Sequence, residues 1–196
     1  MDTVDAGLAK AALRKALRTV RRSHVAALDP RVKALMFLRP PTPLAAMVPA
    51  GAVVGIYHAG PDEATATSYA RFFHEAGHAI ALPWFEARGA AMRFRRWASP
   101  HLDELLGPDP HGARQPLADA DPLVPEFLFV PLVGFTAGGA RLGQGGGHFD
   151  RWLAAHPDVP AIGMAWDCQL AEGLPTEAHD RPLTAVVTPT RLYGPF

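Results

Sequence analysis

The segment from Arg141 to Asp150 (RLGQGGGHFD) contains four glycines within five positions, with an arginine before them and an aspartate after them. Packing does not explain such a run, because glycine has no side chain to bury and loses the most conformational freedom on folding. Glycine does allow close backbone approach and leaves amide N–H groups bare, and proteins hold polyphosphates with such groups. The Arg141 guanidinium can bind phosphate oxygens, and the Asp150 carboxylate can hold the Mg²⁺ that accompanies a nucleoside triphosphate. Phosphate binding is therefore the first chemistry that the sequence predicts.

The alternative for this segment is a surface loop or linker, because short glycine motifs often arise without function. The flanking residues favour binding. An apolar run at 127–133 precedes the glycines and a helix-like run at 150–155 follows them. A strand, a loop and a helix in this order form anion sites in α/β proteins. The segment is not a P-loop, because no Gly-Lys-Ser/Thr follows the glycines.

The composition predicts a single domain over residues 1–196 with a substantial core, since 48% of the residues are hydrophobic. The 19 basic side chains balance the 19 acidic ones, so any anion binding must be local and no nucleic-acid partner is expected. Cys168 is the only cysteine, which excludes a disulfide framework and a cysteine-built zinc site. The sequence shows neither a membrane-length apolar run nor a signal peptide, so we expect a cytoplasmic protein without a membrane partner.

The elements that must position these residues alternate between short apolar strands and helices. Helical spacing predicts helices over 5–28 and 61–76, and the proline-, glycine- and aspartate-rich stretch 107–125 predicts a long loop or lid. Predicted strands lie at 52–57, 78–82 (closed by Pro83), 91–97, 127–131, 160–165 and 184–188. This alternation predicts an α/β fold with a largely parallel sheet flanked by helices.

Four polar residues elsewhere have two interpretations each. Lys10 and Arg14 share one helix face, but the helix is basic throughout, so spacing alone favours a solvated face. Glu63 either favours the dipole at a helix start or accepts hydrogen bonds from a ligand at the carboxyl edge of the sheet. Asp180 is either a turn residue or, with Asp150, the second carboxylate of a magnesium site.

Residues 74–78 (HEAGH) match the pattern of zinc proteases, which place two histidines on one helix. Gly77 is expected to end the helix, and His78 opens a strand, so the two imidazoles should diverge. A zinc hydrolase is therefore disfavoured. We expect Cys168 to be a packed, neutral thiol, because no histidine lies near it in sequence.

Residues 130–153 (VPLVGFTAGGARLGQGGGHFDRWL) resemble the signature of the 5-formyltetrahydrofolate cyclo-ligase family, also called methenyltetrahydrofolate synthetases. Other segments are similar to family motifs in the same order along the chain. They are the Lys-x-x-Leu-Arg motif at 10–14, a folate-side strand and acidic helix start at 56–63, a Gly-Ile-x-Glu/Gln-Pro turn at 112–116, and a C-terminal block at 162–188. The resemblance covers nearly the whole chain.

The resemblance implies a single α/β domain of the sugar-isomerase and CoA-transferase type. It also implies an enzyme that uses Mg²⁺ and ATP to convert 5-formyltetrahydrofolate to 5,10-methenyltetrahydrofolate. In that reaction the formyl oxygen attacks the γ-phosphate, and nitrogen 10 closes the ring as phosphate leaves. Such catalysis relies on positioning and charge neutralisation. The folate is the expected small-molecule partner, and we expect a monomer or weak dimer.

By the resemblance, Lys10, Arg141 and Asp150 act in catalysis, and Asp150 and Asp180 hold magnesium. A nucleotide-binding role for Lys10 and Arg14 replaces the solvated-face interpretation. The nucleotide-binding residues would be Lys10, Arg14, Arg141, Gly143, Gln144, Gly145, Gly146, Gly147, His148 and Phe149. The folate-binding residues would be His58, Glu63, Met92, Gln144 and His148.

The chain departs from the family pattern inside the glycine motif. His148 and Phe149 stand where the family usually has two tyrosines, and Gln144 stands where it often has an aromatic or basic residue. The imidazole of His148 thus replaces a phenol that could hydrogen-bond folate. This departure leaves a second hypothesis open, a folate- or nucleotide-binding paralogue that does not turn over.

Overall fold

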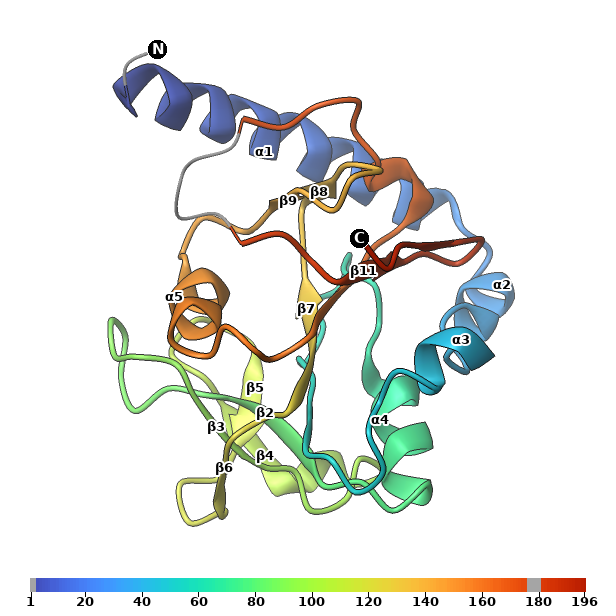
Figure 1. Ribbon diagram of the computed structural model, residues 1–196, viewed down its shortest axis with the longest axis vertical. Coiled ribbons are helices and arrows are strands. Elements are labelled where there is room, and N and C mark those ends of the chain that lie inside the picture. The colour runs from blue at the N-terminus through green and yellow to red at the C-terminus, as the bar shows by residue number, and fades with distance from the viewer. Residues whose placement is uncertain (1–2, 176–180) are drawn as a thin grey trace.

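The computed structural model describes residues 3–175 and 181–196, and it is built on an eight-stranded sheet (Figure 1). The strand order is β12-β11-β10-β7-β1-β2-β3-β6. The five central strands, β11 to β2 in this order, run parallel, whereas β12, β3 and β6 pair antiparallel with their neighbours. The bounds are β1 Val54–Gly55, β2 Ile80–Trp84, β3 Arg93–Arg96, β6 Pro122–Leu123, β7 Phe127–Pro131, β10 Ala161–Met164, β11 Ala185–Val187 and β12 Leu192–Tyr193. The predicted α/β fold with a largely parallel sheet is confirmed.

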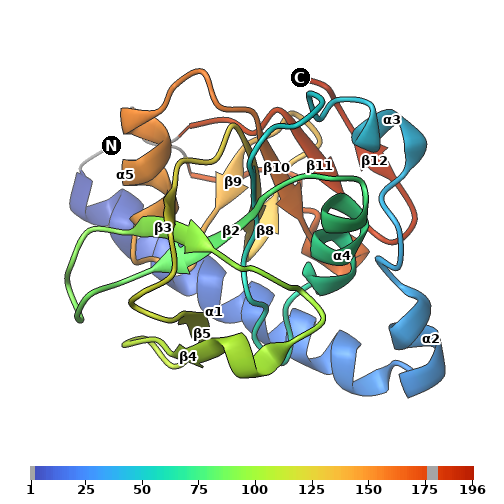
Figure 2. The same ribbon diagram turned by 90° about the horizontal axis from the view of Figure 1, so that it is seen from below.

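Helices cover both faces of the sheet. The side chains of a strand point alternately to its two sides, so the apolar residues on each face need a helix to pack against. Phe127 and Phe129 of β7 pack in the same cluster as Phe73 of α4 (Thr67–Glu75). Leu128 between them packs with Trp152 of α5 (His148–Ala155) on the other face. Figure 2 shows α4 and α5 on opposite sides of the central strands. Two short helices, α2 (Pro30–Leu35) and α3 (Thr42–Ala45), lead into β1.

The long helix α1 (Thr3–Ala27) lies across the sheet beyond the carboxyl end of β7 (Figure 1). Arg21 Nη1 donates to the carbonyl of Leu132, just after β7, at 3.3 Å. A Cβ atom on Gly134 would come within 2.5 Å of a Leu17 methyl group, so a larger residue here would force that side chain of α1 to move. After β10, the 3-10 turn Asp167–Gln169 contacts the same helix. The helix therefore closes the edge of the sheet at which α/β proteins bind ligands.

Residues 107–125, predicted as a loop or lid, contain strands. β4 (Leu106–Pro108) and β5 (Arg114–Pro116) form a hairpin, and β6 extends the main sheet. Asp109 Oδ1 closes the hairpin turn by accepting from the amides of His111 and Ala113 at 2.7 and 2.8 Å. Gln115 then joins the hairpin to the chain after β2, since its side chain accepts from Phe85 N at 2.8 Å and donates to Phe85 O at 3.2 Å.

Several predicted element bounds differ from the structure; the strand predicted over 52–57, for example, spans only Val54–Gly55. The helix predicted over 61–76 begins only at Thr67, because Glu63 Oε2 accepts from Gly60 N at 2.8 Å and closes a turn instead. Strand β2 continues through Pro83, which was predicted to end it. Backbone groups of successive residues in a strand point alternately to its two neighbours. The carbonyl of Ile80 accepts from Trp97 N, after β3, and the carbonyl of Ala81 accepts from Ile56 N, after β1. Pro83 is odd-numbered like Ala81, so its nitrogen faces the β1 side. There β1 pairs only with Ile80 and Ala81, so no ladder bond requires the N–H that proline lacks.

Two further strands, β8 (Gly134–Phe135) and β9 (Arg141–Leu142), form a hairpin that leads from β7 into the glycine loop and α5. A 3-10 turn at Asp103–Leu105 precedes β4. Among the described residues, none of the helices is both long enough and apolar enough to cross a bilayer.

Candidate active site

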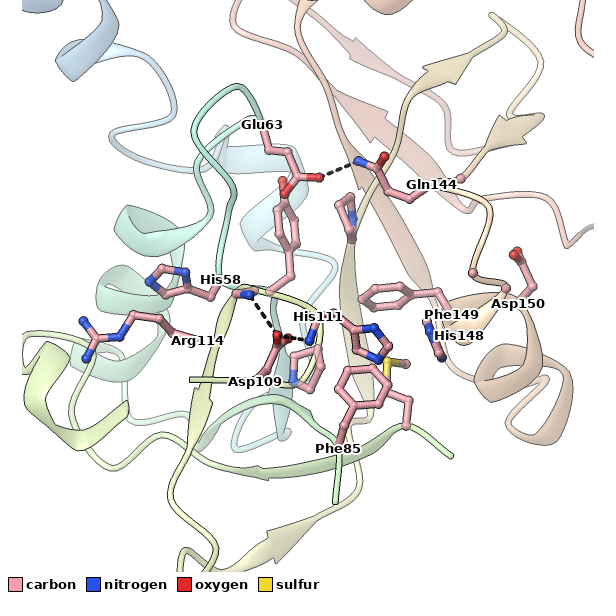
Figure 3. Close-up of a pocket in the computed structure, with 18 of the residues that line it drawn as sticks. His58, Glu63, Phe85, Asp109, His111, Arg114, Gln144, His148, Phe149 and Asp150 are labelled. Atoms are coloured by element: carbon pink, nitrogen blue, oxygen red, sulfur yellow. Dashed lines mark hydrogen bonds between the residues drawn. The ribbon is translucent and has the colours of Figure 1, made fainter. Parts of the chain in front are cut away.

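Most of the predicted site residues line one cavity of about 340 Å³ at the carboxyl edge of the parallel strands (Figure 3). The turn after β1, the β4–β5 hairpin, the glycine loop 143–147 and the first turn of α5 enclose it. The predicted residues that line it are His58, Glu63, Met92, Arg141, Gly143, Gln144, Gly146, Gly147, His148, Phe149 and Asp150. The whole lining comes from residues 57–63, 83–92, 109–114 and 131–150, so stretches far apart in the sequence meet at one site.

The glycine loop leads directly into the amino end of α5. Gly145 and Gly147 have φ angles of 107° and 64°, in the left-handed region that favours glycine. Gly147 is the N-cap of α5, and a Cβ atom on Gly146 would come within 2.8 Å of the His148 ring. The loop therefore brings bare backbone and the positive end of a helix dipole to the cavity, which suits a phosphate group.

Arg141 and Asp150 form an ion pair at the inner end of the glycine loop. The Arg141 side chain is only 3% exposed, whereas the Asp150 side chain is 28% exposed. Gly143 lies beside both groups, since a Cβ atom on it would come within about 4 Å of each side chain. A buried cation and a partly exposed carboxylate can bind a phosphate and its metal ion, respectively.

The basic side chains of α1 are divided between the glycine loop and solvent. Lys10 is 5% exposed. Arg14 Nε donates to Gly143 O at 2.9 Å, and Arg18 Nη2 donates to Gln144 O at 2.6 Å. Lys15 and Arg22, by contrast, are exposed. The solvated face suggested by spacing alone is therefore wrong for both residues, because Lys10 is buried and Arg14 packs against the glycine loop. Neither of these two side chains lines the cavity, and Arg14 contacts the glycine loop instead.

Glu63 approaches the glycine loop from the opposite side of the cavity. Its Oε1 accepts from Gln144 Nε2 at 2.7 Å and lies 3.9 Å from Arg21 Nη1. Tyr57 is buried nearby, and burial together with the negative charge of Glu63 raises the pKa of its phenol well above the usual value. Tyr57 therefore stays neutral, and its hydroxyl donates to Ala64 O.

An aromatic wall consisting of Phe85, His111 and His148 closes another side of the cavity. The three rings contact one another with centroids 4.7 to 5.0 Å apart. Burial lowers the pKa of His148, as do the positive charge of Arg151 and the nearby His111, while Asp109 opposes the shift. The pKa of His58 is also lowered, mainly by burial. Both imidazoles are therefore disposed to be neutral near pH 7.

Sequence reasoning missed several residues around the cavity, namely Tyr57, Phe85, Asp109, His111 and Arg114. Arg114 lies in the motif at 112–116, which was a signal that could have found it. Asp109 and His111 belong to a turn whose composition resembles that of any surface loop, so the sequence carries no signal for them. Of the remaining predictions, Gly145 lies in the loop beside Arg14. Asp180 lies outside the described residues.

The zinc-protease pattern does not form one helical face. Helix α4 ends at Glu75, and His78 Nδ1 lies 3.0 Å from the carbonyl oxygen of Ala52. His74 instead approaches His101. In residues 3–175 and 181–196, no three His, Cys, Asp or Glu side chains cluster as a metal site would require. Burial raises the pKa of Cys168, which agrees with a packed, neutral thiol.

A profile of the 5-formyltetrahydrofolate cyclo-ligase family matches residues 6–189. Over 70 residues the chain is 49% identical to the 5-formyltetrahydrofolate cyclo-ligase of Escherichia coli strain K12. This match covers 35% of this chain and 38% of that protein. Over 67 residues it is 37% identical to the enzyme of the same name from Mycolicibacterium smegmatis, covering 34% of each. The matched stretches span well under half the length of these curated relatives.

Solved structures extend the likeness over almost the whole chain. The NMR structure of Aquifex aeolicus 5,10-methenyltetrahydrofolate synthetase has a TM-score of 0.63 and 25% identity, and covers 95% of this chain and 92% of that chain. The structure of a 5,10-methenyltetrahydrofolate synthetase from Mycoplasma pneumoniae has the same fold, with a TM-score of 0.63, 20% identity and coverage of 90% and 96%. The chain therefore belongs to the 5-formyltetrahydrofolate cyclo-ligase family.

Proposed function

We propose that this protein uses Mg²⁺ and ATP to convert 5-formyltetrahydrofolate to 5,10-methenyltetrahydrofolate, with release of ADP and phosphate. One observation carries the proposal beyond family membership. The glycine loop, with its buried arginine, and the carboxylate of Glu63 face the same cavity and are joined by a hydrogen bond from Gln144. This arrangement supports the proposal, because a transfer requires the phosphate donor and the acceptor ring to bind side by side.

The glycine loop and α1 would bind the nucleotide. In this proposal the amides of residues 143–147 and the Arg141 guanidinium hold the phosphates, while Lys10 and Arg14 add positive charge from α1. The oxygen ligands that Mg²⁺ prefers are available from Asp150, and from Asp180 by the family resemblance. Bound Mg²⁺ supplies neutralisation of the charge on the transferred phosphate.

The opposite side of the cavity would bind the folate. Glu63 accepts hydrogen bonds from the pterin, and His58, Met92 and His148 enclose the ring. The formyl oxygen attacks the γ-phosphorus as the bond to ADP breaks. Nitrogen 10 then attacks the activated carbon and loses its proton, and the carbon–oxygen bond breaks to release phosphate. The residues of the chain contribute by orienting the two substrates and stabilising charge.

The test is the absorbance of the methenyl product after the protein is mixed with ATP, Mg²⁺ and 5-formyltetrahydrofolate. We expect product and an equal amount of ADP, a large loss of both in Asp150→Asn, and little change in the matched control His74→Ala. Equal losses in the two variants would contradict the assigned roles.

A second candidate, a binding paralogue without turnover, is favoured by one observation. His148 replaces the family's tyrosine, and its ring is engaged by Phe85 and His111. This candidate predicts calorimetric binding of folate or ATP without phosphate release. Product formation by His148→Tyr but not by the wild type would decide in its favour.

The proposal also includes the domain count, the fold type, the cellular location and the oligomeric state. The folding unit is one domain over residues 1–196, of the sugar-isomerase and CoA-transferase type, in agreement with the mostly parallel sheet. The protein acts in the cytoplasm as a monomer or weak dimer. Light scattering coupled to gel filtration tests the oligomeric state, and a single unfolding transition tests the domain count.

A further inference from the structure

Gln144 contacts three parts of the site at once. Its backbone belongs to the glycine loop, and its side-chain amide donates to Glu63 Oε1 at 2.7 Å across the cavity (Figure 3). Its side-chain oxygen accepts from Arg18 of α1, with distances of 3.0 Å to Nη2 and 3.2 Å to Nε. The same guanidinium also donates to the Gln144 carbonyl at 2.6 Å.

These partners allow only one orientation of the amide. A guanidinium can only donate and a carboxylate can only accept, so the amide oxygen must face Arg18 and the nitrogen must face Glu63. Gln144 itself is exposed, so hydrogen bonds rather than packing hold it in place. Its position therefore depends on both α1 and Glu63.

The bond from Gln144 also orients Glu63. One carboxylate oxygen accepts from Gly60 N at 2.8 Å and the other from Gln144 at 2.7 Å. Two bonds at the two oxygens define the plane of the carboxylate. Each oxygen keeps a second lone pair with which it can accept a donor from a ligand.

We propose that Gln144 is a positioning residue that couples the nucleotide half of the cavity to its folate half. The proposal rests on the function proposed above. A phosphate group that orders the glycine loop also orders Gln144, and Gln144 then presents Glu63 in one orientation to the folate. By the reciprocity of linked binding, the folate must tighten nucleotide binding by the same factor.

The test measures this factor by titration calorimetry with two probes, 5-formyltetrahydrofolate and a non-hydrolysable β,γ-imido analogue of ATP with Mg²⁺. Each probe is titrated into the protein with and without saturating amounts of the other. For the wild type we expect each ligand to bind at least about five-fold more tightly in the presence of the other. For Gln144→Leu, which keeps the size but removes the amide, we expect this factor to fall to about one while each ligand alone still binds.

Two controls separate coupling from local damage. His74→Ala, remote from the loop, should keep the wild-type factor. Arg18→Met should lower the factor as well, because the amide is then free to turn away from Glu63.

Three results would overturn the proposal. The first is a wild-type factor of about one with both ligands bound, which leaves the proposed function intact. The second is a factor in Gln144→Leu equal to that of the wild type, even if both affinities are lower, since Gln144 would then be only a local contact. The third is failure of the wild type to bind either probe, which would remove the proposed function together with the coupling.

Discussion

Replacing Asp150 by alanine should destabilise the protein even in the absence of substrates. The substitution removes the carboxylate beside Arg141, whose side chain is 3% exposed and is poorly hydrated. Loss of one partner of a fully buried ion pair costs about 3–5 kcal/mol. Because Asp150 is 28% exposed, water can partly replace it, and we expect a decrease in the free energy of unfolding of about 2–3 kcal/mol.

The magnitude can be measured as a melting temperature. For a chain of this size, 1 kcal/mol corresponds to roughly 2–4 °C, so Asp150→Ala should melt about 4–12 °C below the wild type. Asp150→Asn keeps a hydrogen-bond acceptor for Arg141 and should lose only about 1 kcal/mol. The matched control, His74→Ala, should stay within about 0.5 kcal/mol of the wild type.

Scanning calorimetry with and without Mg²⁺ and the ATP analogue tests both roles of Asp150. At a ligand concentration 100 times its Kd, binding should stabilise the wild type by roughly 2.7 kcal/mol. The increase in the free energy of unfolding caused by Mg²⁺ and the ATP analogue should be much smaller in both Asp150 variants. An Asp150→Ala protein that melts with the wild type would refute the ion pair, and an undiminished gain from the nucleotide would refute the metal role.

Three more predictions concern the walls of the cavity. The lowered pKa of His148 means that, as the pH falls below the ordinary value of 6.5, the unfolded state takes up protons before the folded state does. The stability of the wild type should thus decrease when the pH is lowered from 7.5 to 5.5. The melting temperature of His148→Phe should decrease less than that of the wild type between the same two pH values. Gly147→Ala should lower the free energy of unfolding by about 1–2 kcal/mol, because the φ angle of 64° is unfavourable for a residue with a Cβ atom. The new Cβ atom would come within 2.8 Å of Arg151, but that side chain can move away. A melting temperature equal to that of the wild type would contradict the assigned backbone conformation. Gln115→Leu should remove both bonds to Phe85 and speed amide hydrogen exchange in residues 106–116 but not in 67–75; equal acceleration in both segments would indicate global destabilisation instead.

Elements with strong local signals were predicted well. The strand predicted at 127–131 coincides with β7, and the predictions at 160–165 and 184–188 contain β10 and β11. These strands are buried on both faces, so they form continuous apolar runs. The N-terminal helix was equally clear, because leucines recur at helical spacing among basic residues.

Elements stabilised by distant partners were not predicted. β4 and β5 have three residues each and include proline and glycine, so no local pattern separates them from a loop. Their hairpin is held in place by the two hydrogen bonds between Gln115 and the backbone of Phe85, 30 residues away. Similarly, Glu63 was expected at a helix start, but its bond to Gly60 makes a turn that places the carboxylate in the cavity.

The sequence by itself determined the chemistry available at the site. The glycines, the arginine and the aspartate at 141–150 indicate phosphate binding on their own, because residue types set which ligands a loop can hold. Tertiary structure decided which groups serve that chemistry. Arg14 and Lys15 are neighbours on the same basic helix, yet Arg14 bonds to the glycine loop and Lys15 is exposed. Only the packing of the loop against one side of α1 distinguishes them, and only the closing of the β1 turn and the hairpin around the loop brings Glu63 and His111 into the same cavity.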